Sequence, residues 1–368
     1  MHCRSWISAN FLHVQPHQND NAMNKPVSDA APFVHPHQIE VQEFSTYARV
    51  IDARSAAEYA EDHIPGAVNV PTTLDVDAST ARDSGSNPVA AIPSALAAAA
   101  VGLLPGDTVL VYCSKGGRCA VVLADLLRRQ GYQVDVLPGG WPSYRQWVSA
   151  GLDVLPRTLE FRRIWAPPAI GIEQVVEALR DEGQQAIDIA AMSGVVHWPG
   201  VPTQRQGLVT QTAFESLLLD ALRHQESDRA VWVASCPTLP HKLTMPPAMR
   251  VALERASTVK LQLPTTVRSA AWIEQLVRAG TPCVIAIEEA TQFGKRPSRQ
   301  QLAQWRRLVE SDRAEDALVT VIDDYIDVVF AAGQQSMPGR VLGLDSLDRA
   351  RVRFLLSSWL AQAGCRQT

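Results

Sequence analysis

The stretch TVLVYCSKGGRCAVVLADLLRR, Thr108 to Arg129, places an apolar segment, a glycine-containing loop and an amphipathic segment one after another. Its first five residues are mostly apolar and β-branched, which is typical of a buried strand. From Ala120 onward apolar residues recur at helical spacing, and Gly131 follows as a helix stop. A strand that runs straight into a helix indicates a parallel α/β sheet. Cys113 then lies at the carboxyl end of its strand, where such sheets bind ligands.

The same alternation extends over the first part of the chain. The polar stretch from Thr72 to Pro93 is expected to be a loop, followed by an Ala-rich helix. Period and turn residues predict further strands and one helical turn on both sides of the quoted stretch. The strands are Tyr47 to Asp52, Val68 to Val70 and Val134 to Leu137, and the helical turn is Ala56 to His63.

A chain of 368 residues is long enough for two domains. The expected order is a disordered leader (1–36), a first α/β domain (37–151), a linker (152–160), a second α/β domain (161–335) and a helical tail (336–368). For the second domain the patterns predict strands at Phe161 to Trp165, Ala186 to Ile189, Ala230 to Ala234, Val259 to Leu263 and Leu318 to Ile322, and helices at Glu173 to Arg180, Ala213 to Arg223, Ser269 to Arg278 and Arg299 to Val309.

Composition excludes several classes of protein. A formal net charge of −4 argues against binding nucleic acid through bulk positive charge. The six cysteines are scattered without the paired spacing of a zinc site, and the histidines show no ligand spacing, so neither a metal nor a cofactor is expected. No apolar run approaches the length of a membrane span. These features favour a protein of the cytoplasm.

The loop after Cys113 is suited to hold an anion. Gly116 and Gly117 allow successive backbone N–H groups to converge on one point, and the helix that follows adds its positive end. Lys115 and Arg118 contribute positive charge, and Ser114 lies between the cysteine and the first of them. A thiolate at the base of such a loop is stabilised over the thiol. We therefore expect Cys113 to be a nucleophile rather than a structural thiol.

Two anion chemistries use a cradle of this kind: phosphate-ester hydrolysis and sulfur transfer. The tyrosine-phosphatase pattern has an arginine six positions after the cysteine to clamp the phosphate, and here that position is Cys119. Sulfur transfer is therefore favoured. Cys119 is expected to pack in the first helical turn; the alternative is that it resolves a Cys113 persulfide into a disulfide.

Four motifs in order resemble a rhodanese domain: DARSAAEY from Asp52, HIPGAVNVP from His63, CSKGGR from Cys113, and GGW ending at Trp141. The resemblance implies that Cys113 accepts a sulfane sulfur, or selenium, and holds it as a persulfide. The donor would be a substrate such as thiosulfate, a persulfide or selenophosphate. Asp52, Arg54, Glu58 and His63 are interpreted as structural support, with Arg54 and Glu58 as an ion pair one helical turn apart.

The order of the parts resembles bacterial tRNA 2-selenouridine synthase, a family that implies selenation, and also geranylation, of a wobble thiouridine in tRNA. That family carries a P-loop in its second domain. Here APPAIGIE from Ala166 to Glu173 keeps only Gly171 of the glycine, lysine and hydroxyl pattern, and Pro167 and Pro168 lack amide donors. ASCP from Ala234 replaces the acidic residues expected after the preceding strand. We interpret the second domain as a degenerate P-loop-like domain.

Three functions remain open at this point: a sulfur- or selenium-transferring enzyme that acts through Cys113, a true tRNA-modifying enzyme with a remodelled second domain, and a non-catalytic binding or scaffold protein. A possible tRNA contact is the segment Lys295 to Arg307, which holds five cations and no acid. A plain solvated helix face is the alternative reading of that segment.

Overall fold

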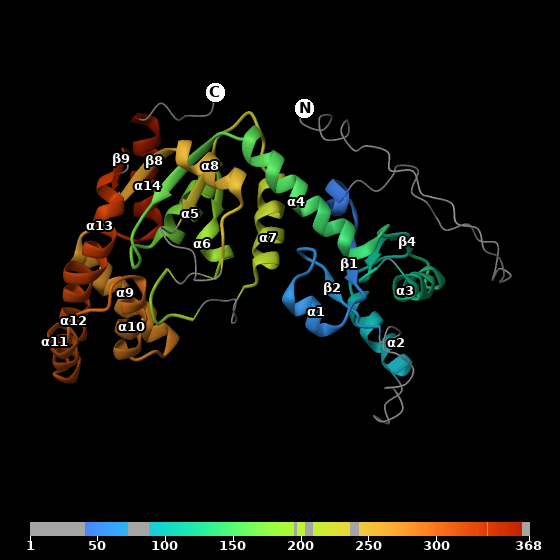
Figure 1. Ribbon diagram of the computed structural model, residues 1–368, viewed down its shortest axis with the longest axis horizontal. Helices are drawn as coiled ribbons and strands as arrows, with labels where there is room; N and C mark the ends of the chain where they lie inside the picture. The colour runs from blue at the N-terminus through green and yellow to red at the C-terminus, as the bar shows by residue number, and fades with distance from the viewer. Residues whose placement is uncertain are drawn as a thin grey trace. The chain divides into compact units, whose positions relative to one another are not determined.

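The structure is a computed structural model, and it describes residues 41–72, 88–115, 117–194, 197–202, 209–235, 243–336 and 338–362. The chain divides into two compact units at Val148 and Ser149 (Figure 1). Each unit is built on a sheet whose described strands are all parallel. The predicted α/β class is confirmed. The expected leader, 1–36, lies outside the described residues.

The first unit has a four-stranded sheet in the order β2-β1-β3-β4. The register pairs Asp52 at the end of β1 with Tyr112 at the end of β3, so the carboxyl ends of these strands meet at one edge. Its strands are β1 (Arg49–Asp52), β2 (Val68–Asn69), β3 (Thr108–Tyr112) and β4 (Gln133–Val136). Its helices are the 3-10 helix η1 (Val41–Thr46), α1 (Ala56–Glu61), α2 (Pro88–Ala99) and α3 (Arg118–Arg129).

The core of the first unit lies between this sheet and the helices α2 and α3. Every residue of β3 after Thr108 is buried, which explains its continuous run of apolar side chains. One face of α3 supplies Leu123, Ala124 and Leu127 to the same core. The strand and the helix that flank the Cys113 loop are thereby fixed in place by apolar packing.

The second unit has a five-stranded sheet in the order β6-β7-β5-β8-β9. The first strand of the unit, β5, is therefore central in the sheet. Strands β6 and β7 lie on one side of it, and β8 and β9 lie on the other. The strands are β5 (Phe161–Trp165), β6 (Gln185–Asp188), β7 (Val231–Ser235), β8 (Ser257–Gln262) and β9 (Arg340–Gly343). The loop that leaves β5 thus stands where the direction of strand addition reverses, the usual place of a ligand crevice.

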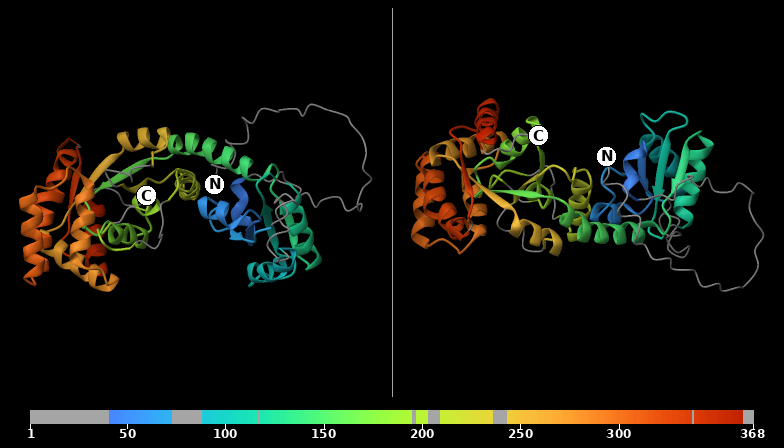
Figure 2. Two further views of the ribbon diagram at one scale, coloured as in Figure 1. Left: turned by 60° about the horizontal axis from the view of Figure 1, so that its bottom comes forward. Right: turned by 90° about the horizontal axis from the view of Figure 1, so that it is seen from above.

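Two apolar clusters organise the helices of the second unit. One lies against the sheet and includes α5 (Ile172–Asp181) and α14 (Arg349–Gln362), which pack side by side. The other is a helical group that Figure 2 shows at the end of the unit in orange. The remaining elements are α6 (Ile189–Met192), α7 (Gln211–Arg223), α8 (Pro247–Arg255), α9 (Thr265–Ala279), α10 (Cys283–Ala290), η3 (Thr291–Phe293), α11 (Arg299–Glu310), α12 (Ala314–Val321), the π-helix η4 (Ile322–Ile326) and α13 (Asp327–Ser336).

The structure corrects three of the expected elements. Helix α4 (Gly140–Thr158) runs through the expected linker 152–160, with Pro156 in its last turn. Leu318 to Ile322, expected as a strand, is the end of α12 and the start of η4. The helical tail begins at α14, whereas β9 before it belongs to the second sheet.

The search for membrane spans gave a negative result. Within the described ranges, no helix is both long enough and apolar enough to cross a bilayer.

Candidate active site

Cys113 occupies the point where β3 ends and the loop toward α3 begins. Its side chain is 2% exposed. The backbone N–H of Gly117, the N-cap of α3, lies 3.1 Å from Cys113 Sγ and donates to it. The Cys113 carbonyl in turn accepts from the N–H of Trp141 at 2.9 Å. The sulfur therefore accepts a hydrogen bond from an amide at the N-terminus of a helix.

Two positively charged residues lie in the loop after Cys113 and at the start of α3. Lys115 and Arg118 are both exposed, and neither makes an ion pair with any described residue. Gly116 lies outside the described residues. Cys119 is 2% exposed and joins the apolar core of the unit. The described loop thus presents two cations to solvent and one buried thiol at its base.

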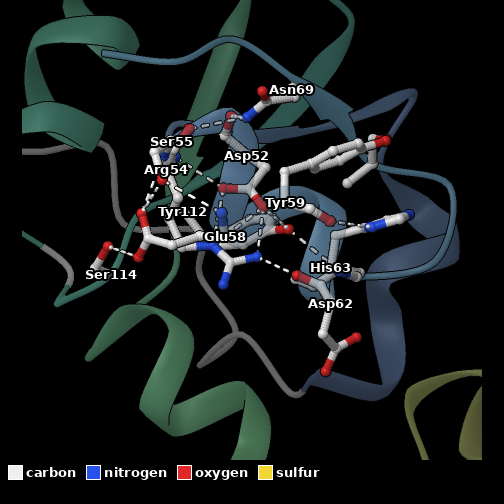
Figure 3. A network of polar contacts seen from close by, with 12 residues as sticks. Asp52, Arg54, Ser55, Glu58, Tyr59, Asp62, His63, Asn69, Tyr112 and Ser114 are labelled. Atoms are coloured by element: carbon white, nitrogen blue, oxygen red, sulfur yellow. Dashed lines mark hydrogen bonds and ion pairs between the residues drawn. The ribbon is translucent and has the colours of Figure 1, made fainter. Parts of the chain in front are cut away.

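Ser114 ties the loop to α1. Its hydroxyl donates to Glu58 Oε1 at 2.9 Å, and Figure 3 shows the two side chains facing one another. Glu58 also closes a capping box with Ser55, whose hydroxyl donates to Glu58 Oε2 at 2.7 Å. Partial burial alone would raise the pKa of Glu58, but the hydrogen bonds from Ser55 and Ser114 outweigh it and lower that pKa below its ordinary value. Glu58 is therefore an ionised anchor of the loop.

A buried ion pair between Asp52 and Arg54 lies beneath the loop. Arg54 donates to both carboxylate oxygens of Asp52, with Nη2 to Oδ2 at 2.7 Å. Its guanidinium also donates to the Asp62 carbonyl at 2.6 Å. Burial alone would lower the pKa of Arg54, but the hydrogen bond and charge of Asp52 raise it above its ordinary value. The expected ion pair of Arg54 with Glu58 is wrong: the partner of Arg54 is Asp52, two residues before it.

Two aromatic residues that were not among the predicted site residues, Tyr112 and Trp141, complete this network. The Arg54 guanidinium carbon lies 3.7 Å from the ring centroid of Trp141. Gly139 and Gly140 both have positive φ, 70° and 60°, and this turn brings Trp141 over the arginine. Tyr112 donates to Asp52 Oδ2 at 2.6 Å, and burial together with this carboxylate raises the pKa of Tyr112, so its hydroxyl stays protonated. The GGW motif was the available signal for Trp141.

His63 lies apart from the cysteine loop in its contacts. Its ring stacks on Tyr59 with centroids 4.0 Å apart, and its Nδ1 is 2.8 Å from the Tyr59 carbonyl oxygen. Next to it, Asp62 pairs with Arg145 of α4 at 3.1 Å. The contact of His63 with Tyr59 holds the segment between α1 and β2 against α1 (Figure 3). The supporting role expected of His63 stays a prediction.

The loop after β5 in the second unit does not fit a phosphate group. Arg268, which is 2% exposed, donates to the carbonyls of Pro168 and Ala169, both at 3.1 Å. The N–H of Ala169 is used by the His197 carbonyl at 2.8 Å. A Cβ on Gly171 would lie 2.6 Å from Leu347, so an apolar side chain fills the space above the loop. Carbonyl oxygens and a leucine stand where a P-loop presents amide donors.

A histidine that the sequence did not mark lies beside this loop. His197 Nε2 is 3.0 Å from Asp188 Oδ2, at the carboxyl end of β6. Burial alone would lower the pKa of His197, but its hydrogen bond to Asp188 and the charges of Asp188 and Glu173 raise it. The indole of Trp198 donates to Glu173, which makes this carboxylate part of the packed structure. Ala234 is buried at the end of β7, and the rest of ASCP lies largely outside the described residues.

The five cations of the Lys295 to Arg307 segment lie before α11, at its first residue and in its C-terminal half. All five are exposed, and one of them, Arg306, lies 3.6 Å from Glu288. Trp305 of the same helix is fully buried, so it anchors the helix and is not available to stack on a base. Of the residues expected to contact tRNA, the five cations are accessible to solvent and Trp305 is not.

Comparisons with known proteins match the first unit to one family. Residues 39–146 match the model described as Rhodanese-like domain. A curated relative, tRNA 2-selenouridine synthase of Shewanella loihica, is 24% identical over 246 residues, which are 62% of this chain and 64% of the relative. The match therefore spans less than two thirds of that relative's length. One solved structure, described as "Crystal structure of N-terminal domain of putative ATP/GTP binding protein from Clostridium difficile 630", is 26% identical, covers 27% of this chain and 87% of that chain, and has a TM-score of 0.23. Residues 39–146 therefore match a rhodanese-like domain, and the chain resembles tRNA 2-selenouridine synthase.

Proposed function

We propose that this protein transfers sulfane sulfur or selenium through a persulfide, or its selenium analogue, on Cys113. The observation that carries the proposal is the 3.1 Å approach of the Gly117 N–H to Cys113 Sγ at the start of α3. The Gly117 N–H and the positive end of α3 stabilise a thiolate on Cys113. This thiolate must attack the sulfur donor. No metal or cofactor takes part in the proposed reaction, and the donor is a substrate.

With thiosulfate as donor, the Cys113 thiolate attacks the outer sulfur. A new S–S bond forms, the old S–S bond breaks, and sulfite leaves with the electron pair. The exposed charges of Lys115 and Arg118 favour the approach of a dianion and stabilise the departing one. An acceptor nucleophile then attacks the terminal sulfur, and Cys113 leaves as the thiolate that began the cycle.

Phosphate-ester hydrolysis is the less favoured use of this loop. A phosphatase needs an arginine in the position of Cys119 to hold the dianion through two parallel hydrogen bonds. Cys119 is buried in the apolar core instead.

The test is sulfur transfer from thiosulfate to cyanide with purified full-length protein, followed as thiocyanate. Cys113→Ser should reduce transfer to the uncatalysed background, and mass spectrometry should find one added sulfur on the wild-type protein and none on Cys113→Ser. Cys119→Ser is the matched control, because both thiols are 2% exposed. Absence of both thiocyanate and a Cys113 persulfide with every donor tried would refute the proposal.

The Cys119 control also separates the two roles considered for that residue. If Cys119 only packs, alkylation with iodoacetamide after persulfide formation labels it as fully as before. If it attacks the Cys113 persulfide, a disulfide forms between the two thiols and hydrosulfide leaves. The disulfide would then appear in the wild type and be lost in either serine variant.

Modification of tRNA is the second candidate, and the similarity to tRNA 2-selenouridine synthase is the observation that favours it. We propose the exposed cations from Lys295 to Arg307 as the surface that would contact the RNA backbone. Selenation of the wobble uridine, compared in a strain with and without this gene, tests the activity. Reversal of Arg299 and Arg307 to Glu should weaken tRNA binding and lower its salt dependence, whereas reversal of the paired Arg278 should not. Unchanged wobble selenium without the gene would exclude this candidate.

A further inference from the structure

Arg54 forms a fixed platform beside the cysteine loop. The N–H of Ala53 donates to the Tyr112 carbonyl at 2.8 Å, so the chain that leaves β1 runs along the chain that leaves β3. Arg54 follows Ala53 directly and is 4% exposed. Its guanidinium donates to the Asp52 carboxylate and to the Asp62 carbonyl, which fixes the plane of the guanidinium (Figure 3). Because Asp52 neutralises this guanidinium, it acts on its surroundings through its position rather than through net charge.

Trp141 connects this platform to the backbone of the cysteine. Its ring lies on the guanidinium of Arg54, with 3.7 Å between Cζ and the ring centroid. Its backbone N–H donates to the Cys113 carbonyl at 2.9 Å. Two residues earlier, the Val111 carbonyl accepts from the Leu137 N–H at 2.9 Å, so both bonds continue the pairing of β4 with β3. One residue, through its side chain and its main chain, therefore joins Arg54 to Cys113.

The Cys113 carbonyl belongs to the peptide unit from which the loop departs. A peptide unit is planar, so the hydrogen bond to this carbonyl also fixes the direction of the Ser114 N–H. Further along the loop, the Gly117 N–H donates to Cys113 Sγ at 3.1 Å. A rotation of the first peptide unit would move the loop, and with it this donor, relative to the sulfur. The geometry at the sulfur therefore depends on the contact between Trp141 and Arg54.

We propose that Trp141 is a positioning residue for sulfur transfer, because its contact with Arg54 holds the backbone of Cys113 in place. The inference rests on the proposed function of Cys113. Lys115 and Arg118, the exposed cations after the cysteine, keep their charge when the ring is lost, so attraction of a dianionic donor should persist. Loss of the ring should therefore lower kcat for thiosulfate and leave KM little changed.

Four variants test this positioning role through the kinetics. Trp141→Met and Trp141→Leu remove the ring, and each should lower kcat for thiosulfate about tenfold with KM within about twofold. Trp141→Phe restores a flat ring over the guanidinium and should recover kcat to within about threefold of the wild type. The matched control is Trp147→Leu on the same helix, α4, since Trp147 is also half-buried. Its ring packs against Phe44 and Tyr144, and among the described residues no guanidinium lies over it, so kcat should be unchanged.

A second readout follows the loop without any sulfur transfer. In amide NMR spectra of the full-length protein, the Gly117 signal reports the hydrogen bond to Cys113, and Cys113→Ala gives its position without that bond. In the two ringless variants this signal should move toward the Cys113→Ala position, and in Trp147→Leu it should stay at the wild-type position. Circular dichroism verifies folding of each variant.

Two results would overturn the proposal. One is a wild-type Gly117 signal in a folded ringless variant of Trp141, and the other is an equal shift of that signal in Trp147→Leu. Absence of sulfur transfer by the wild-type protein would refute the proposed function alone, because the Gly117 signal then still decides whether Trp141 positions the loop.

Discussion

Replacement of Arg54 by Met removes one partner of a buried ion pair while keeping a side chain of similar length. The side chains of Arg54 and Asp52 are 3% and 0% exposed, so solvent cannot compensate the remaining carboxylate. Breaking a buried pair in this way costs about 3 to 5 kcal/mol. Asp52 keeps the hydroxyl of Tyr112 at 2.6 Å and the Arg54 backbone N–H at 2.8 Å, which favours the lower end of that range. We expect a loss of about 3 kcal/mol, part of it from the lost contact with Trp141.

Hydrogen exchange measured by mass spectrometry suits this prediction, because it reports each unit by itself. Amides of β1 and β3 exchange through the unfolding of the first unit. A loss of about 3 kcal/mol should lower their protection by roughly 100-fold, and leave the strands of the second unit unchanged. Arg157→Met is the control, since its ion pair with Asp153 has side chains 66% and 67% exposed and should cost under about 1 kcal/mol. Protection in β1 and β3 that falls by less than about threefold in Arg54→Met would refute the reasoning.

Three further changes test the anchors of the two units. Glu58→Ala removes the acceptor of the Ser114 hydroxyl and should lower kcat/KM for thiosulfate about tenfold. Ser55→Ala removes the helix cap but keeps the acceptor of Ser114, so it should lower kcat/KM less. Equal losses in the two variants would contradict the role of Glu58 in holding the Cys113 loop. The pKa of His197 is raised in the folded state, so its stabilisation is complete below its ordinary value of 6.5 and is lost as pH rises through the folded pKa. Thermal melts of the wild type should therefore lose stability over that interval, and His197→Gln should flatten the profile. Arg268→Met leaves the carbonyls after β5 without their donor and should destabilise the second unit by about 3 kcal/mol in urea unfolding; a change under about 1 kcal/mol would contradict this.

The strands of both sheets could be predicted because most of them are buried apolar runs. The exceptions have physical reasons. β9 was missed because three of its four residues are exposed, so its sequence carries no apolar run. Leu318 to Ile322 is rich in apolar and β-branched residues, as a strand is, but it is buried in a group of helices. The spacing of apolar residues cannot distinguish a short buried helical segment from a strand. Most of the expected linker is helical, although it contains Pro156. This proline falls in the last turn of α4, so only two helical residues follow the backbone hydrogen bond that it cannot form.

The site was predictable where one motif contains all of its parts. Cys113 and its loop are contiguous, and the strand-to-helix junction fixes their geometry. The ion-pair partner of Arg54 could not be predicted from residue spacing, because helical spacing favoured Glu58. In the structure α1 begins only after Ser55, and the Arg54 guanidinium binds Asp52 instead. The contact with Trp141 joins residues far apart in the sequence. Such contacts follow from the fold and not from a local pattern.

The dependence of the Cys113 cradle on Trp141 has a consequence for synthesis of the chain. The backbone N–H of Trp141 binds the Cys113 carbonyl, and its ring covers the arginine beneath the loop. A ribosome exposes the cysteine before it exposes this tryptophan. During that interval the thiol has no assembled surroundings, and it reacts as an ordinary exposed cysteine of a nascent chain. The sulfur transfer proposed for this domain would therefore start only after the GGW turn has emerged.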